Sequence, residues 1–433
     1  MATVVPFRGV RYNLEKAGNL ADLVTPPYDV IDAEGQKMYH EKSPYNVIRL
    51  ELGYKYPDDS EENNRYTRAR DTFRRWLAEG ILRHDPRPAI YLYQQEFDAR
   101  GERKVRTGFI AGVKVEDYSK GVVLPHEETL PKHKADRLEL MRHCLANFSP
   151  IFGLYSDPDH AVDSLLEQAK GGRAPDMEVT DENGIVNRLW VIDDPEVVAR
   201  VVAMMADKKI YIADGHHRYE TALAFSKEME AKGQPGYDYI MMTLVNLYDR
   251  GLVVFPTHRL VYNLTNFNLD ALVANLQENF MVEELPAGTE LPEVLRRLEE
   301  AGRQTAAFAM YAGGGRYFLL TLKDRAVMKD LVPDRSEAWR NLDVTILHTL
   351  ILEKYLGIGS QQRAEESNLV YTRDEEFAVR EVDKGNFQLA FLMNPTRVEE
   401  VTAVAEGGEK MPQKSTFFYP KVITGLVIND FTR

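Results

Sequence analysis

The chain has 433 residues, of which 44% are hydrophobic and 28% charged, a composition typical of a globular protein that can bury sizeable cores. Its length predicts roughly three domains of ~150 residues each. With 67 acidic and 54 basic residues the formal net charge is −13, which argues against binding of nucleic acid by the surface as a whole. The single cysteine, Cys144, excludes an internal disulfide bond and a multi-cysteine metal site.

The N-terminus and the apolar runs indicate where the protein acts. The first residues contain no basic segment followed by an apolar core, so we expect no signal peptide. No apolar run approaches the ~20 residues that span a bilayer. Because a lone cysteine also fits a reducing compartment, we expect a cytoplasmic protein that binds no membrane.

In chain order, the hydrophobic patterns predict an α/β fold with mixed sheets and packed helices. Apolar residues at spacings of three and four predict a helix over 61–79. Residues 89–97 and 105–115 read as a β-hairpin, and residues 239–247 and 252–262 as a second one. We therefore expect sheets that are covered by helices on at least one face.

The C-terminal part predicts a further α/β region. Gly313, Gly314 and Gly315 precede a strand rather than a helix, so they form a hairpin loop and not a phosphate loop. Residues 337–356 predict one long helix. We expect three regions: an N-terminal α/β region over 1–120, a core over 121–265 and a C-terminal α/β region over 266–433.

The densest polar chemistry lies where an apolar strand meets a helix. The residues of this junction are Asp214, Gly215, His216, His217 and Arg218. Gly215 accepts positive φ and lets the chain turn. The first amides of the helix have no intrahelical partner and carry partial positive charge, so they bind phosphate, sulfate or carboxylate. Arg218 can hold a phosphate bidentately, and the histidines can donate to it or move a proton.

Several roles are open to Asp214. It could cap the helix, bind Mg²⁺ that arrives with a nucleotide or phosphate, or orient a histidine. Zinc is less favoured because the helical HExxH spacing is absent. In the purely structural alternative, Asp214 is an N-cap, the histidines lie at the surface and Arg218 pairs with Glu220 or a neighbour.

A second polar stretch supplies further candidates. His126 and Glu127 lie in a loop before a helix and could provide metal ligation or a general base, and Glu128 is an equally plausible carboxylate. Lys134 and Arg137 could reach an anion. Alternatively, the last two form surface ion pairs worth under ~1 kcal/mol.

Three more candidates lie towards the C-terminus. His258 falls inside an apolar strand pattern, so it must lie at a strand end or have partners. Lys414 and Lys421 flank an aromatic extended segment. They are candidates for substrate binding, and the alternative is a pair of exposed lysines at a sheet edge.

The junction resembles the signature of the ParB/sulfiredoxin superfamily, which includes CTP-binding ParB proteins, ATP-binding sulfiredoxin and free serine kinases. The resemblance rests on Asp214 to Arg218, followed by Tyr219 and Ala222. It implies a core in which a Gly-containing turn binds nucleotide phosphates. Sulfiredoxins place a cysteine at this turn, where the present chain has histidine, so a sulfinic-acid reductase is not expected.

Nearly the whole chain also resembles a bacterial and archaeal family, the domain-of-unknown-function family numbered 1015. This resemblance implies a prokaryotic cytoplasmic protein and no settled activity. It rests on motifs at seven places: Thr25–Ile31, His126-Glu127 with Thr129, Lys134 with Asp136 to Leu138, Ser149–Phe152, Ala213–Arg218, Pro256–Arg259 and Lys414–Lys421.

The leading hypothesis is a phosphate- or nucleotide-binding enzyme, a phosphotransferase or phosphatase that acts on a serine-like hydroxyl or its phosphate ester. Gly215, His216, His217 and Arg218 would hold the phosphate, Asp214 and His217 would assist the chemistry, and Glu127 is the favoured base. The ligand would be ADP, ATP, CTP or a small phosphorylated molecule. One alternative is a nucleotide-binding regulatory switch without turnover. Another is a ParB-like nucleic-acid-processing protein, which the acidic charge disfavours. The sequence leaves a homo-oligomer open.

Overall fold

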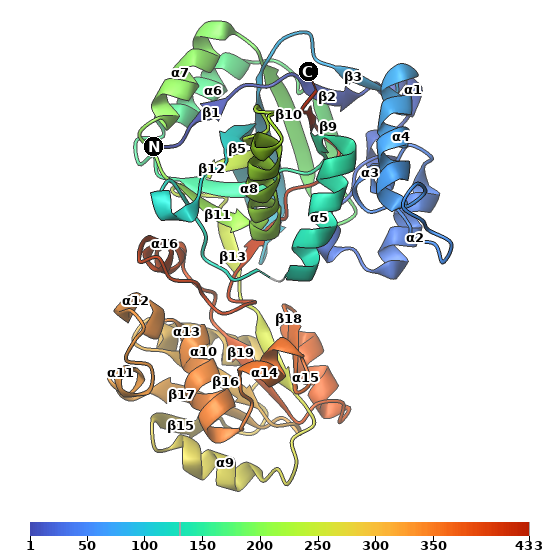
Figure 1. Cartoon of the computed structure of the whole chain (residues 1–433). Helices are drawn as coiled ribbons and strands as arrows, with labels where there is room; N and C mark the ends of the chain where they lie inside the picture. The colour runs from blue at the N-terminus through green and yellow to red at the C-terminus, as the bar shows by residue number, and fades with distance from the viewer. Residues whose placement is uncertain (130, 433) are drawn as a thin grey trace. The chain divides into compact units, whose positions relative to one another are not determined.

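The computed structural model describes residues 1–129 and 131–432, and of residues 131–133 the backbone alone. By its internal contacts the chain forms two compact units, whose elements are labelled in Figure 1. Unit 1 comprises Met1–Pro125, Thr129–Val253 and Phe418–Arg433, and unit 2 comprises His126–Glu128 and Val254–Phe417.

Unit 1 is organised around a nine-stranded mixed sheet. Its strand order is β6-β11-β8-β12-β5-β4-β10-β9, with β1 pairing with β5. The strands are β1 (Val4–Val5), β4 (Ile90–Ala99), β5 (Glu102–Lys114), β6 (Val123–Leu124), β8 (Ile151–Tyr155), β9 (Met177–Thr180), β10 (Val186–Ile192), β11 (Ile210–Asp214) and β12 (Tyr239–Asn246). Because β5 pairs with both β4 and β12, the predicted regions 1–120 and 121–265 share one sheet.

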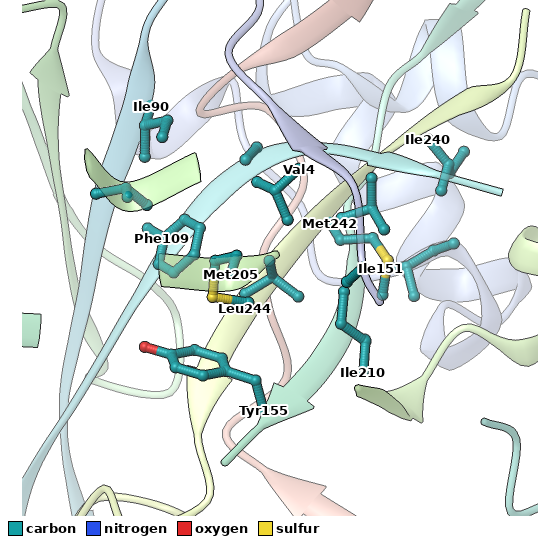
Figure 2. Packing of buried hydrophobic residues seen from close by; sticks show 14 of the residues in the cluster. Val4, Ile90, Phe109, Ile151, Tyr155, Met205, Ile210, Ile240, Met242 and Leu244 are labelled. Atoms are coloured by element: carbon teal, nitrogen blue, oxygen red, sulfur yellow. The ribbon is translucent and has the colours of Figure 1, made fainter. Parts of the chain in front are cut away.

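The main core of unit 1 lies between this sheet and the helices α6 (Ala161–Lys170), α7 (Pro195–Met205) and α8 (His216–Ala231). Figure 2 shows Phe109 and Leu244 of the sheet beside Met205 of α7. Fully burying a side chain such as Phe109 contributes about 1.5–3 kcal/mol. This packing fixes α8, and with it the junction at its first turn, against the sheet.

A second sheet of unit 1 has the order β3-β2-β21-β7. It joins both ends of the chain, since β2 (Gly9–Tyr12) pairs with β21 (Ile428–Asp430). Its other strands are β3 (Leu82–His84) and β7 (Ala146–Asn147). The remaining helices of the unit are α1 (Leu14–Ala17), α2 (Ala33–Lys42), α3 (Ile48–Glu51), α4 (Arg65–Ala78) and α5 (Pro131–Cys144), with 3₁₀ turns at Leu20–Asp22, Tyr28–Val30 and Tyr118–Lys120. Of these, α5 lies beside α8 (Figure 1).

Unit 2 contains a six-stranded sheet of order β15-β17-β16-β19-β14-β18, with its core against α10 and α15. Its strands are β14 (His258–Val261), β15 (Phe280–Glu284), β16 (Ala307–Tyr311), β17 (Tyr317–Leu322), β18 (Leu369–Thr372) and β19 (Leu389–Met393). Its helices are α9 (Leu269–Leu276), α10 (Leu291–Gly302), α11 (Val327–Leu331), α12 (Glu337–Arg340), α13 (Asp343–Ile346), a π-helix (Leu347–Tyr355), α14 (Ser360–Ala364), α15 (Glu375–Asp383) and α16 (Val398–Glu406). The chain passes between the units in β13 (Val253–Phe255) and β20 (Phe417–Tyr419).

The α/β class with mixed sheets and packed helices is confirmed, as is the first hairpin, which β4 and β5 form. The second predicted hairpin is wrong. Strand β12 pairs with β5 and β8, whereas β14 pairs with β18 and β19. Close packing favours the long-range pairing of β12, because a Cβ added at Gly108 would lie 2.6 Å from the Leu244 carbonyl oxygen. The side-chain-free glycine thus lets the two strands meet.

The long helix predicted over 337–356 is also wrong in detail. The segment is broken into α12, α13 and a π-helix. The break falls at Asn341 and Leu342, where Leu342 adopts an extended backbone with φ −67° and ψ 134°. Among the described residues, no helix has the length and apolar character that a membrane span requires.

Unit 2 carries a half-buried carboxylate that should make its stability depend on pH. Burial, and then the nearby Glu400, raise the pKa of Asp343 from 3.8 to about 7, against the opposing effect of Arg325 and Arg397. The unfolded chain releases this proton first, so the contribution of Asp343 to stability falls as pH rises from about 4 to about 7.

We therefore expect Asp343→Asn to gain stability over wild type across that pH interval, with the two proteins converging at lower pH. Urea unfolding at several pH values measures this difference. A difference between the two proteins that stays constant from pH 4 to pH 8 would contradict the assignment.

Candidate functional site

The junction forms as its residue types predict. In β11 the first four residues are buried and Asp214 is half-buried at the strand end. Gly215 turns the chain with φ +95° and ψ 28° and is the N-cap of α8, which begins at His216. Since Gly215 has no side chain, the first amides of α8 receive no cap from it. The helix start therefore has the backbone geometry of an anion site.

The N-cap position of α8 belongs to Gly215, and Asp214 lies one residue before it. The Asp214 carboxylate faces two cations. Oδ1 lies 3.0 Å from Lys421 Nζ, and Oδ2 lies 3.6 Å from Arg218 Nη2. The side chains of Asp214 and Lys421 keep 18% and 16% of their surface exposed, so this pair remains within reach of a ligand.

The Arg218 guanidinium is buried and bonded to the protein, whereas a fork that is free to bind phosphate would be exposed. Arg218 is 7% exposed, and its Nη1 donates to Ser149 Oγ at 3.1 Å and to the Pro150 carbonyl at 2.7 Å. Ser149 in turn donates to Glu51 Oε1 at 2.8 Å. The ion pair of Arg218 is with its neighbour Asp214, an outcome that the structural alternative also allowed. Protein contacts thus occupy one nitrogen of the fork, while Nη2 is directed at Asp214.

The two histidines of the junction differ in burial. His216 is 5% exposed, and His217 is half-buried in the first turn of α8. His217 is therefore the histidine that is more accessible to a ligand.

The sequence reasoning assigned no role to Asp29, which adjoins the site. Asp29 is exposed as a residue, while nearby protein atoms desolvate its carboxylate and Asp214 repels it. Both effects raise its pKa, while Arg218 and Lys421 oppose them. The neighbouring Tyr28 ring lies 6.0 Å from the Arg218 guanidinium carbon. The motif around Thr25–Ile31 was visible in the sequence, but nothing local linked it to residue 214.

Arg106 is a second residue that the sequence did not point to. It is 2% exposed, and its electrostatic neighbours include Asp214. Burial lowers its pKa to about 10, so the guanidinium stays charged at neutral pH. The guanidinium carbon lies 4.5 Å from the centre of the Phe152 ring. In β8, Phe152 pairs with Asp214 of β11, which brings Arg106 to the same end of the sheet.

Lys134 and Arg137, predicted as weaker substrate-binding residues, make ion pairs within unit 1. Lys134 Nζ lies 3.0 Å from Glu220 Oε2. Arg137 is 5% exposed, pairs with Glu51 at 3.0 Å and with Asp136 at 2.7 Å, and lies 3.9 Å from the centre of the Tyr28 ring. The pair that Arg137 makes with Glu51 is buried, whereas the sequence suggested a surface ion pair.

Four predicted residues belong to unit 2. His126 is 1% exposed, and its Nε2 lies 2.9 Å from Thr416 Oγ1. The Glu127 carboxylate accepts from the Lys414 amide at 3.5 Å, and the Lys414 side chain is exposed. His258 has 0% exposure; its Nδ1 accepts from the Met393 amide at 3.0 Å. The expectation that His258 has partners is therefore confirmed.

Neither a metal nor a reactive thiol is built into the described part of the chain. It contains no group of three or more His, Cys, Asp or Glu residues placed to hold a metal ion. Cys144 is buried, and burial raises the pKa of its thiol to about 12. The thiol therefore stays protonated at neutral pH.

The turn makes a prediction about Gly215. A Cβ at this position would lie 2.9 Å from Arg218 Nη2, in addition to the strain of φ +95°. Gly121 is a matched control, since its φ is +65° and no atom lies within 4 Å of an added Cβ. We expect Gly121→Ala to lower the free energy of unfolding by roughly 1–2 kcal/mol. Gly215→Ala should lower it by about 1 kcal/mol more, because Arg218 must give up hydrogen bonds. Equal losses in thermal or urea unfolding would show that the turn does not constrain Arg218.

The comparisons with solved structures find distant likenesses. A free serine kinase in complex with AMP is 16% identical, with a TM-score of 0.35 over 71% of this chain and 89% of that chain. SbnI from Staphylococcus aureus, with a C-terminal truncation, is 10% identical, with a TM-score of 0.36 over 74% and 87%. A conserved hypothetical protein from Pyrococcus furiosus is 15% identical, with a TM-score of 0.33 over 70% and 89%. Likenesses of this size carry no functional argument.

No curated protein matches the chain. The family described as "Protein of unknown function (DUF1015)" matches residues 4–345. This match confirms the resemblance that the motifs from Thr25 to Arg259 indicated. It covers most of the chain, and the protein therefore belongs to the DUF1015 family.

Proposed function

We propose that the protein is a phosphotransferase or phosphatase that binds a nucleotide or small phosphorylated molecule at the junction of β11 and α8. The observation that carries the proposal is the turn itself. Gly215 presents the first amides of α8 beside Asp214, Lys421 and Arg218. Backbone amides at a helix start, together with cationic side chains, are the groups that hold phosphate in proteins.

The charges around the turn favour an anionic ligand. Lys421, Arg218 and Arg106 are cations that neighbour Asp214. They outnumber the carboxylates of Asp214 and Asp29, and burial and repulsion hold the pKa of Asp29 above its ordinary value. A phosphate dianion would neutralise the excess positive charge. In the proposed complex Lys421 supplies the mobile cation, since Arg218 is anchored through Nη1.

For transfer to a serine-like hydroxyl, a base must accept the hydroxyl proton while the phosphoryl group moves from the nucleotide to the oxygen. Asp29 is the carboxylate that we assign to this role, because its electrostatic partners Asp214, Arg218 and Lys421 are the residues of the turn. Glu127, which the sequence favoured, belongs to unit 2 and contacts the Lys414 amide. His217 stays assigned to phosphate binding and proton transfer.

Mg²⁺ was expected to arrive with the ligand and to use Asp214. The geometry does not favour a metal at this carboxylate, because its oxygens face Lys421 and Arg218. A cation bound there would have to displace Lys421 and take most of its ligands from phosphate oxygens.

Ligand binding is the first test. We expect ADP, ATP, CTP or phosphoserine to raise the melting temperature of the wild-type protein. A ligand at a hundredfold excess over its Kd stabilises by about 2.7 kcal/mol. His217→Ala and Lys421→Ala should reduce the shift. Lys227→Ala is the control, since it removes an exposed cation farther along α8. The proposal fails if no phosphorylated ligand shifts wild type, or if both site variants respond as the control does.

Turnover is the second test, and it separates an enzyme from a nucleotide-binding regulator. Serine with ATP or ADP, and phosphoserine with or without nucleoside diphosphate, would be followed by chromatography of the products. Asp29→Asn should lower the rate by roughly 10²–10⁴-fold while retaining ligand binding. Glu127→Gln should remain near wild type. A large loss of rate in Glu127→Gln, with Asp29→Asn near wild type, would instead identify Glu127 as the base. Ligand binding without any turnover would favour the regulator.

A further inference from the structure

The lysine that faces Asp214 comes from a segment far away in the sequence. Phe418–Lys421 follows the point at which the chain returns from unit 2 to unit 1. Lys421 is 207 residues from its partner Asp214. The placement of its ammonium group therefore depends on what holds this segment against the sheet of unit 1.

Two buried polar side chains hold the backbone of this segment. Gln95 Nε2 donates to the Lys421 carbonyl at 3.0 Å, and Arg106 Nη2 donates to the Pro420 carbonyl at 2.6 Å. Arg106 also donates to Gln95 Oε1, which couples the two. Gln95 is 1% exposed and Arg106 is 2% exposed. The same Gln95 Nε2 also donates to Oδ1 of Asn187, a residue of β10, at 3.0 Å.

Aromatic contacts hold the same segment on either side of the polar pair. The rings of Phe97 and Tyr419 lie 5.6 Å apart at 79°, and those of Phe152 and Phe418 lie 5.7 Å apart at 76°. Such edge-to-face pairs contribute about 0.5–1.5 kcal/mol beyond their buried area. Gln95 and Arg106 differ from these aromatic residues because they donate hydrogen bonds directly to the carbonyls of Lys421 and Pro420.

Arg106 is costly to bury without a carboxylate bonded to it. Its Nη1 has no hydrogen-bond partner among the described residues. The guanidinium instead uses the Phe152 ring, the Gln95 side chain and the Pro420 carbonyl. A neutral apolar residue would fill this position at lower cost if packing alone were required. A structural role for the guanidinium would explain its burial, and the backbone acceptor that it contacts, Pro420, directly precedes Lys421.

We propose that Arg106 and Gln95 are positioning residues that fix the Phe418–Lys421 segment so that Lys421 faces Asp214. The role of Lys421 as the phosphate-neutralising cation rests on the proposed function. The fixing of the segment does not, since it follows from contacts of the ligand-free protein. Loss of either side chain frees the carbonyl that it holds, Lys421 for Gln95 and Pro420 for Arg106, and lets the ammonium group leave Asp214.

Lysine acetylation of the full chain, read by peptide mass spectrometry, tests this placement without a ligand. In wild type, Lys421 should react much more slowly than the exposed Lys227. Arg106→Gln should raise the Lys421 rate by roughly tenfold, because bonds to the segment are lost. Arg103→Gln is the matched control, since Arg103 lies on the same strand but is exposed and pairs with Glu96.

Gln95→Glu provides a second variant that keeps an acceptor for Arg106 and loses the amide donor to the Lys421 carbonyl. Gln95→Glu should also raise the acetylation rate of Lys421. Lys208, which is 17% exposed in the same unit, reports on general loosening. An unchanged Lys421 rate in both variants, or an equal rise at Lys208 and Lys421, would overturn the proposal.

Addition of ADP separates this inference from the proposed function. If ADP binds at the turn, it should slow acetylation of Lys421 in wild type and do so less in the two variants. If ADP has no effect at Lys421, the phosphate site is contradicted, whereas the ligand-free rates still decide whether Arg106 and Gln95 position the lysine.

Discussion

The Asp214 carboxylate lies between Lys421 at 3.0 Å and Arg218 at 3.6 Å, and the rest of the site depends on this arrangement. It connects the end of β11, the first turn of α8 and a segment near the C-terminus. Unpaired, a half-buried carboxylate in this position would be costly. The two cations more than offset this carboxylate, so one of them, Lys421, can exchange its carboxylate for a phosphate oxygen in the proposed complex.

The supporting contacts show how unit 1 keeps the cations in place. Arg218 is anchored to the Pro150 carbonyl and, through Ser149, to the buried Glu51. The backbone of Lys421 is held by Gln95, and its ammonium group pairs with Asp214. Arg218 is thus held by bonds to uncharged groups as well as by Asp214, whereas the Lys421 ammonium group contacts the Asp214 carboxylate. A phosphate that enters the turn would meet fixed amides and a fixed guanidinium, and it would recruit the ammonium group.

The sequence predicted the junction well because its signals are local. A buried strand, a glycine turn and a helix start follow one another from Ile210 onwards, and each has a short-range pattern. Asp29 and Arg106 were missed because they lie 185 and 108 positions from Asp214. Only the sheet pairing and the loop that carries Tyr28 bring them near it. The failed hairpin of residues 239–262 has the same origin, since distant strands compete for β12.

A crystal structure of the protein with ADP tests the central claim most directly. The account predicts that the terminal phosphate lies within hydrogen-bond distance of the amides of His216 or His217. It also predicts that Lys421 Nζ contacts a phosphate oxygen rather than Asp214 alone. Nucleotide bound elsewhere in the chain, with the ion pair of Lys421 and Asp214 unchanged and the helix start of α8 without phosphate, would contradict it.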